Sequence, residues 1–133
     1  MQISDLIVKQ KEFLTDQLGE GIMQLAQACD NCLDNEASLD QLNDLLFSYM
    51  QNHLYTNLVY VIDSFGVQLS ANITKEGVDI EFQGQNLSDR PFFSAIDDSH
   101  PIYISDAYIS RVTLKPCISV VHTICHDNEI IGM

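Results

Sequence analysis

The chain has 133 residues, and 46% of them are hydrophobic, which suits one domain with a real core. Nineteen acidic residues against six basic ones give a net charge of −13 at pH 7. This balance repels phosphate groups, so nucleic acids and anionic membrane surfaces are poor partners. The preferred explanation of the charge is an acidic solvated surface that aids solubility.

Residues 3–33 carry apolar side chains at helical spacing over almost their whole length, which predicts one long helix. Gly19 and Gly21 weaken that helix by up to about 1 kcal/mol each relative to alanine. The apolar face of such a helix exceeds what a small sheet can cover. A partner helix from a second copy of the chain is therefore one expectation, and packing entirely within the chain is the other.

A second helix is predicted for residues 39–53, with Ser38 as its N-terminal cap. Residues 58–62 then form an apolar run that is typical of a buried strand. Residues 63–66 contain turn-forming side chains, and residues 67–72 are expected to return as the partner strand of a hairpin.

A loop and then a short helix are expected next. Residues 73–87 contain two glycines and no sustained periodicity, so we expect a loop, with a flap over a ligand as one role for it. Ser88 or Asp89 can cap a helix whose first turn tolerates Pro91, because the missing N–H of proline costs nothing there. Arg90 is therefore expected at the entrance of this helix.

The last part of the chain is predicted to form strands. Residues 103–110 alternate with aromatic and β-branched side chains, and residues 116–126 form a second long apolar strand. A turn at Asp127 and Asn128 leads into residues 129–133. Together with the two helices, these strands predict an α+β fold.

No constellation of catalytic residues is convincing. The sequence has no Gly-x-Ser-x-Gly motif, no glycine-rich phosphate loop and no His-Glu-x-x-His motif. Asp97 and Asp98 have no visible acid–base partner. Cys117 and His122 lie five residues apart, on opposite faces of one strand. We therefore expect no enzyme activity and no cofactor.

The four cysteines are expected to be buried free thiols. Cys29 and Cys32 have helical spacing, whereas Cys117 and Cys125 lie on one face of the predicted strand. A zinc site would need four converging ligands, and these last two cysteines are too scattered from His122 and His126 to provide them. We expect no metal.

Three segments match a known pattern in their order: residues 90–93 (RPFF), 103–110 (YISDAYIS) and 115–120 (KPCISV). With Asp63 and Gly66 in the preceding turn and an Ile-Ile-Gly end, residues 54–133 resemble the Cache or PDC sensor domains. These are PAS-like sensors of bacterial chemoreceptors, histidine kinases and cyclic-di-GMP signalling proteins. The resemblance implies a single domain in which residues 1–53 are helical and residues 54–133 form a PAS-like antiparallel sheet with a ligand pocket.

The resemblance also implies a site. In the family, the arginine that matches Arg90 and the aromatic residue two positions later contact the acid group of the ligand, and Tyr108 matches a ligand-facing tyrosine. Strand alternation places Asp106 and Ser110 on the same face as Tyr108. The candidate ligand-binding residues are therefore Arg90, Phe92, Phe93, Asp106, Tyr108, Ser110 and His122.

Each of these assignments has a structural alternative. Arg90 could instead form an ion pair with Asp89, Asp97 or Asp98, which are close in sequence. Core packing explains Tyr108 as well as ligand contact does. His122 could instead be an ordinary residue of the sheet whose hydrogen bonds are satisfied within the chain.

The sequence departs from the family members that bind amino acids. Those members carry a tyrosine five residues before the arginine, then a tryptophan and a tyrosine, and later an aspartate for the ammonium group; here the positions hold Gln85, Phe92, Phe93 and Ser110. A neutral hydroxyl would leave a buried ammonium group unpaired, which costs several kcal/mol. A small carboxylate without an amine is therefore the expected ligand.

The sequence is compatible with more than one cellular compartment. No apolar run of about 18 residues and no signal-peptide pattern is visible, whereas sensors of the family usually sit outside the membrane between two transmembrane helices. The chain is thus expected to be either a soluble, cytoplasmic relative or an excised extracytoplasmic fragment that ends inside its last strand. The expected function is sensing of a small carboxylate by a homodimer that relays a conformational change to an output domain. The alternative is a ligand-free dimerisation or scaffold module of a signalling protein.

Overall fold

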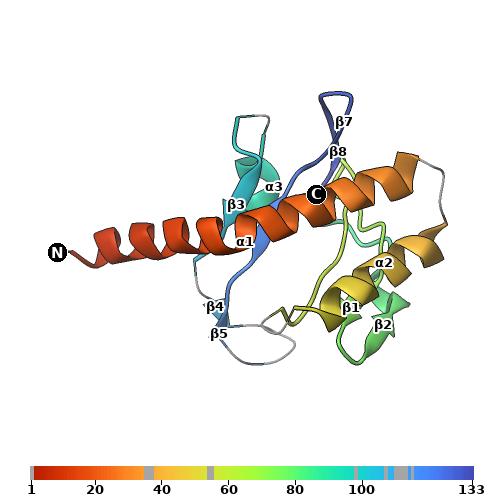
Figure 1. Ribbon diagram of the computed structural model, residues 1–133, viewed down its shortest axis with the longest axis horizontal. Coiled ribbons are helices and arrows are strands. Elements are labelled where there is room, and N and C mark those ends of the chain that lie inside the picture. The colour runs from red at the N-terminus through yellow and green to blue at the C-terminus, as the bar shows by residue number, and fades with distance from the viewer. Residues whose placement is uncertain are drawn as a thin grey trace.

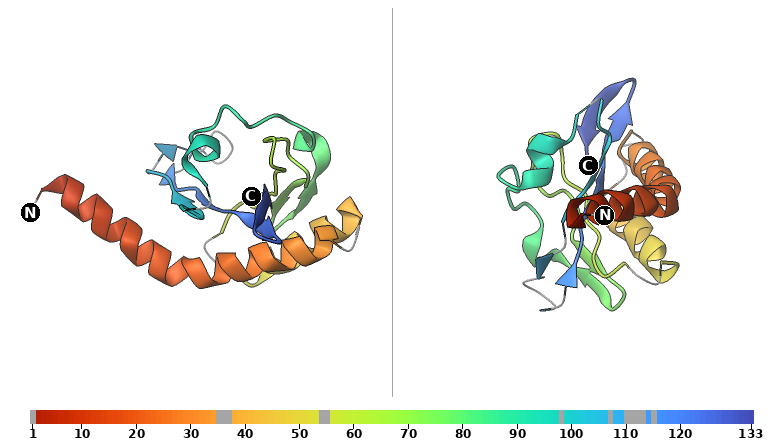
Figure 2. Two further views of the ribbon diagram at one scale, coloured as in Figure 1. Left: turned by 90° about the horizontal axis from the view of Figure 1, so that it is seen from above. Right: turned by 90° about the vertical axis from the view of Figure 1, so that its left-hand side faces the viewer.

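The molecule is an α+β structure in which two helices lie along one side of a set of short antiparallel strands (Figures 1 and 2). The computed structural model describes residues 2–34, 38–53, 56–97, 99–106, 108–109, 114 and 116–133. The elements in chain order are α1 (Ile3–Asp34), α2 (Leu39–Gln51), β1 (Asn72–Thr74), β2 (Gly77–Asp79), the 3₁₀ helix η1 (Ile80–Phe82), α3 (Pro91–Ala95), β3 (Ile102–Ile104), β4 (Tyr108–Ile109), β5 (Pro116–Cys117), β6 (Val120–His122), β7 (Ile124–His126) and β8 (Glu129–Gly132).

Both long helices confirm the sequence prediction. The helix α1 ends one residue later than expected, and α2 ends two residues earlier. Ser38 forms a complete capping box, because the Gln41 backbone N–H donates to Ser38 Oγ at 3.2 Å and the Ser38 backbone N–H donates to Gln41 Oε1 at 2.9 Å. These bonds satisfy two donors at the start of α2, which explains why the helix begins there.

The main core lies between the two helices and the strands. Its buried side chains come from α1, α2, the segment before β1, β1 itself and β7, namely Ala26, Cys29, Leu42, Leu46, Met50, Val61, Ala71, Ile73 and Ile124. The contributions of α1 to this core all come from its C-terminal half. Figure 2 shows the N-terminal part of α1 extending beyond the rest of the molecule.

A second, smaller core lies around α3. Ile62, Leu87 and Phe92 are buried in it, and Tyr60, Phe93, Tyr103, Val121 and Met133 pack around them. Val61 belongs to the main core while its neighbours at 60 and 62 belong to this one, as alternation along an extended segment requires. This burial on both faces explains the apolar run over residues 59–62, whereas Leu58 before it is exposed.

The hairpin predicted for residues 58–72 is present, but it is not regular. Val59 and Ile73 exchange two backbone hydrogen bonds of 3.0 Å, and Ile62 pairs with Gln68. Between these pairs Ser70 interrupts the ladder, because its Oγ accepts the Val61 N–H at 2.8 Å. The antiparallel return is therefore confirmed, whereas two continuous strands are not found in this segment.

The loop predicted for residues 73–87 is wrong over its first part. Strands β1 and β2 pair antiparallel there, with Ile73 opposite Val78, and η1 follows. Each strand has only three residues. A strand of three residues is too short to show a periodic pattern in the sequence, and this hairpin was therefore predicted as a loop.

The two long strands predicted for residues 103–126 are divided into shorter ones. Ser119 marks one break, because its backbone N–H donates to Ser105 Oγ at 2.8 Å instead of to a carbonyl. The Thr123 N–H still donates to the carbonyl of Pro101 at 2.9 Å, in the register of β3 and β6, and the chain pairs with β8 only after it. The chain thus changes partner as it advances: β5 pairs with β4, β6 with β3 and β7 with β8.

The turn predicted at the end of the chain is confirmed. Asp127 and Asn128 have φ angles of 50° and 66° and connect β7 to β8 in a two-residue hairpin. Among the described residues the strands form four separate two-stranded pairs. The α+β class is therefore shown, and the PAS-like sheet stays a prediction. No helix in the described ranges is long and apolar enough to cross a bilayer.

Candidate functional site

Arg90 is exposed and lies at the start of α3, where the sequence predicted it, but the predicted cap at Ser88 or Asp89 is wrong, because Arg90 is itself the N-cap residue and makes no side-chain cap bond. Its backbone is extended, with φ −74° and ψ 146°, and Pro91 follows in the first turn of the helix. Its carbonyl accepts the Phe93 N–H at 3.1 Å, and its own N–H donates to Leu87 at 3.0 Å. The backbone is therefore held at both ends, while the guanidinium group lies on the surface.

Two tyrosines lie within reach of the charge of Arg90. Burial raises the pKa of Tyr60, the neighbouring Tyr108 adds to the rise, and Arg90 opposes it. Burial also raises the pKa of Tyr108, and Arg90 again opposes the rise. Arg90 and the two tyrosines come from three separate segments of the chain and lie near enough for the charge of Arg90 to act on both phenols, which keep their protons at neutral pH. They can donate hydrogen bonds to an anion that the guanidinium attracts.

Tyr108 is anchored from the neighbouring strand. Its hydroxyl lies 2.7 Å from Ser119 Oγ, and the Cys117 thiol of its partner strand β5 is a second hydrogen-bonding neighbour. The side chain stays 46% exposed. Core packing, the structural alternative for this tyrosine, therefore does not describe it.

No ion pair between Arg90 and a nearby aspartate is found among the described residues. The described residues Asp89 and Asp97 make no ion pair with it, and Asp98 lies outside the described residues. Asp97 instead accepts hydrogen bonds from the backbone of Ser99 and of His100, both at 2.8 Å. A local turn therefore occupies this carboxylate, and the hydrogen bond from the His100 ring lowers its pKa.

The two phenylalanines of α3 are held in the smaller core. Phe92 is 8% exposed and packs with Ile62 and Leu87, so little of its ring remains for a ligand. Phe93 is half-buried against the same cluster. The pair therefore anchors α3 and, with it, the position of Arg90.

Of the remaining candidates, the structure describes Asp106 and His122. Asp106 is exposed and lies before β4, which begins at Tyr108, and Ser110 lies outside the described residues. His122 follows Val121, whose side chain packs in the smaller core, so the histidine faces the opposite side of β6. Its Nδ1 lies 2.7 Å from the carbonyl of Thr123. This contact fits the alternative of a satisfied sheet residue.

Tyr60 and Ser119 belong to the candidate site, and the sequence reasoning missed both. Tyr60 is hidden in an apolar run, where its one signal is that it is the single side chain with a polar tip. Ser119 interrupts the apolar residues around it in the same way. Only the pairing of distant segments shows that these hydroxyls meet Arg90 or Tyr108.

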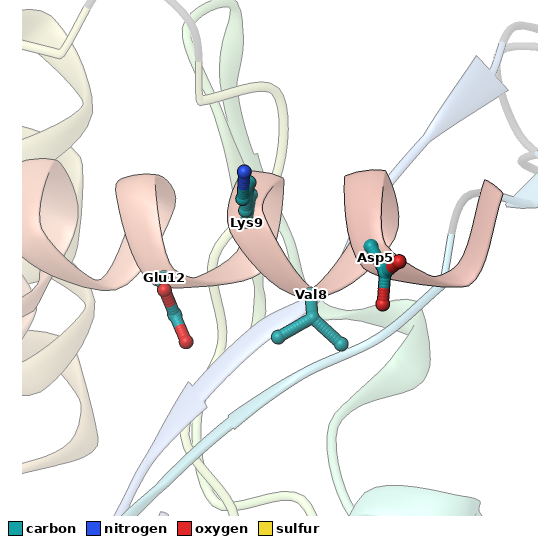
Figure 3. A pocket seen from close by; sticks show the side chains of 4 residues that line it. All are labelled: Asp5, Val8, Lys9 and Glu12. Atoms are coloured by element: carbon teal, nitrogen blue, oxygen red, sulfur yellow. The ribbon is translucent and has the colours of Figure 1, made fainter. Parts of the chain in front are cut away.

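Two shallow hollows lie elsewhere, on the protruding part of α1. Asp5, Val8, Lys9 and Glu12 line a hollow of about 420 Å³ on successive turns of this one helix (Figure 3). Leu6 and Phe13 line a similar hollow beside it, together with Lys9. Neither hollow includes Arg90, and both are open to solvent, so neither is a built ligand site.

Cysteines and metals add no chemistry in the described part of the chain. All four cysteines are free, but only Cys29 is buried, and Cys125 is exposed because its neighbour Ile124 takes the inward face of β7. Burial, with a contribution from Cys32, raises the pKa of the Cys29 thiol to about 12. It is therefore an inert core thiol. No group of three or more His, Cys, Asp or Glu side chains there could hold a metal ion.

Comparisons with known proteins do not assign the chain. No family model matches the sequence, and no curated protein matches it either.

Proposed function

We propose that the chain is a PAS-like sensor domain that binds a small carboxylate beside Arg90 and relays a conformational change to an output domain. The observation that supports this is that the charge of Arg90 acts on both Tyr60 and Tyr108 and opposes the rise of their pKa values. A guanidinium offers two parallel donors to a carboxylate, and neutral phenols add further donors without adding charge. In a chain with a net charge of −13, an exposed arginine flanked by tyrosines is a local exception that favours an anion.

The proposed contacts differ in part from the sequence expectation. Arg90, Tyr60 and Tyr108 would touch the ligand, and Ser119 would orient the Tyr108 hydroxyl. Phe92 and Phe93 would anchor α3 in the smaller core and thereby hold Arg90 in position. An α-amino acid would bring an ammonium group, and none of these contacts carries a negative charge to pair with it, so a carboxylate without an amine fits better.

A melting-temperature screen tests the proposal. We expect at least one small mono- or dicarboxylate to raise the melting temperature and glycine, alanine and aspartate to leave it unchanged. A ligand at a hundred times its dissociation constant adds about 2.7 kcal/mol of stability, which is easily seen in a domain of this size. A panel in which no carboxylate acts, or in which amino acids bind tightly, would contradict the proposal.

Replacing Arg90 separates binding from folding. Because Arg90 is exposed, Arg90→Ala should change the stability of the free protein by no more than about 1 kcal/mol. Affinity for the carboxylate should fall by roughly thirtyfold or more, as for other charge pairs that lose one partner. Lys9→Ala removes a surface cation from α1 and serves as the control that keeps wild-type affinity.

A second candidate function, a ligand-free homodimerisation or scaffold module, has its own supporting observation. The N-terminal half of α1 leaves Ile3, Leu6 and Phe13 at 77%, 49% and 62% exposure. Helices of this kind owe most of their stability to packing, and none of the described side chains in this half belongs to either core of the chain. A second copy of α1 would cover these side chains in either functional proposal, so the carboxylate screen decides between the two.

A further inference from the structure

A histidine near the end of the chain lies among three carboxylates from two separate parts of the fold. His126 Nδ1 is 3.2 Å from Asp30 Oδ1, and His126 Nε2 is 3.2 Å from Asp34 Oδ1 and 3.3 Å from Asp127 Oδ2. Asp30 and Asp34 belong to α1, whereas Asp127 lies in the turn after β7. The imidazole thus joins the end of α1 to the hairpin of β7 and β8, which Figure 1 shows side by side.

The geometry requires a proton on both ring nitrogens. A neutral imidazole has one donor nitrogen and one acceptor nitrogen, and here the acceptor would point its lone pair at a carboxylate. The shielding of Asp30 strengthens this requirement, because its Oδ1 is buried and has no aligned hydrogen bond in the described structure. A buried carboxylate oxygen of this kind needs a positive charge beside it.

The negative charge at the end of α1 also favours a protonated imidazole at His126. The last turn of the helix contains no basic residue, although the exposed carbonyls there carry partial negative charge. Two aspartates at this end are unfavourable unless a cation compensates them. A protonated His126 supplies such a cation, from a strand more than ninety residues further along the chain.

We propose that His126 is a pH-responsive clamp that holds the hairpin of β7 and β8 against the end of α1 when its imidazole is protonated and loosens this contact when the proton is lost. The clamp does not depend on ligand binding at Arg90. Among the described residues, the charged groups that face His126 are Asp30 and Asp34 from α1, Asp127 from its own turn, and Glu129, its cross-strand neighbour in β8. All four are acidic, so loss of the proton leaves only mutual repulsion.

The direction of the pH dependence follows from these neighbours. The hydrogen bond to Asp30 and the charges of Asp127 and Asp34 raise the pKa of His126 above its usual value. A raised pKa in the folded state means that the contact stabilises fully below the unfolded value of about 6.5 and is lost as the pH rises through the folded value. The clamp is therefore closed in mild acid and open in mild alkali.

The first test is an NMR titration of the imidazole in the full chain. We expect the midpoint for His126 to lie above 6.5, its usual value, and the backbone amides of Asp30 and Asp34 to shift with the same midpoint. A midpoint at or below the usual value would overturn the proposal.

The second test is hydrogen exchange with His126→Gln, which keeps a polar side chain but cannot be protonated. In the wild type, the protection factors of the amides in β7 and β8 should fall by about two- to fivefold as the pH rises through the midpoint, the range expected for a partly exposed ion pair. Amides of α2 provide the internal reference. In the variant this pH-dependent fall should disappear.

Two further variants keep the test decisive. His100→Gln removes a histidine–aspartate contact of 3.1 Å that lies within one turn, so it should keep the wild-type pH dependence of the hairpin. Asp30→Asn keeps the histidine and removes its most buried partner, so it should reduce the dependence even if His126→Gln fails to fold. An unchanged fall in protection in His126→Gln or in Asp30→Asn would overturn the clamp.

Discussion

At the scale of single residues, two glycines show how local space decides the effect of one methyl group. A Cβ atom at Gly132 would collide with the carbonyl oxygen of Ile62, to which β8 is joined by the backbone bonds of Met133 at 2.9 and 3.0 Å. A Cβ atom at Gly21 would meet nothing closer than the ring of His53 at 4.0 Å. Replacing glycine by alanine should therefore change the free energy of unfolding in opposite directions at the two positions.

We expect Gly132→Ala to lower the free energy of unfolding by roughly 1 to 3 kcal/mol, because backbone must shift to admit the methyl group. Gly21→Ala should raise it by about 0.5 to 1 kcal/mol, because α1 gains a better helix former without a clash. Urea unfolding of both variants measures the difference. Equal effects at the two sites would show that the close approach at Ile62 is not maintained in solution.

At the scale of elements, the unsupported half of α1 predicts self-association. A helix of 32 residues is about 48 Å long, and only its C-terminal half reaches the main core (Figure 2). Ile3, Leu6 and Phe13 recur at spacings of three and seven residues, so they share one face of the exposed half. Val8 is also exposed but lies on the opposite face.

Sedimentation velocity at micromolar concentration should therefore find a dimer. Replacing Ile3, Leu6 and Phe13 together by glutamine should convert it to a monomer, whereas Val8→Gln should leave the dimer intact. A wild-type chain that sediments cleanly as a monomer would disprove the association and would leave the exposed face without an explanation.

At the scale of the whole molecule, the acidic charge opposes compactness. Nineteen acidic residues repel one another with six basic ones to offset them. Sodium chloride raised from about 10 mM to about 150 mM shortens the screening length from about 30 Å to about 8 Å. We expect the urea midpoint to rise over this range, because screening weakens the general repulsion more than it weakens the few short contacts such as those of His126.

The same series with potassium chloride is the control, because a charge effect should not depend on which monovalent cation is used. Sulfate is avoided, since it strengthens apolar burial by another route. A midpoint that falls with salt would mean that specific ion pairs, rather than net charge, dominate the electrostatic part of stability.

The sequence by itself determined the elements that depend on near neighbours. The helices α1 and α2 could be predicted because helical spacing and the Ser38–Gln41 capping box involve residues at most a few positions apart. The two-residue turn at Asp127 and Asn128 was predictable for the same reason, since these side chains tolerate positive φ. The placement of Arg90 at a helix entrance also needed only Pro91 and its neighbours.

Only the tertiary structure decided the features that join distant segments. The predicted strands of residues 103–126 are interrupted where Ser105 Oγ accepts the Ser119 N–H, a bond that a local pattern assigns to a regular ladder. The approach of Tyr60 and Tyr108 to Arg90, and of His126 to Asp30, likewise depends on how separate elements pack. Spacing along a chain carries no information about such contacts, because their formation depends on the close packing of the whole molecule.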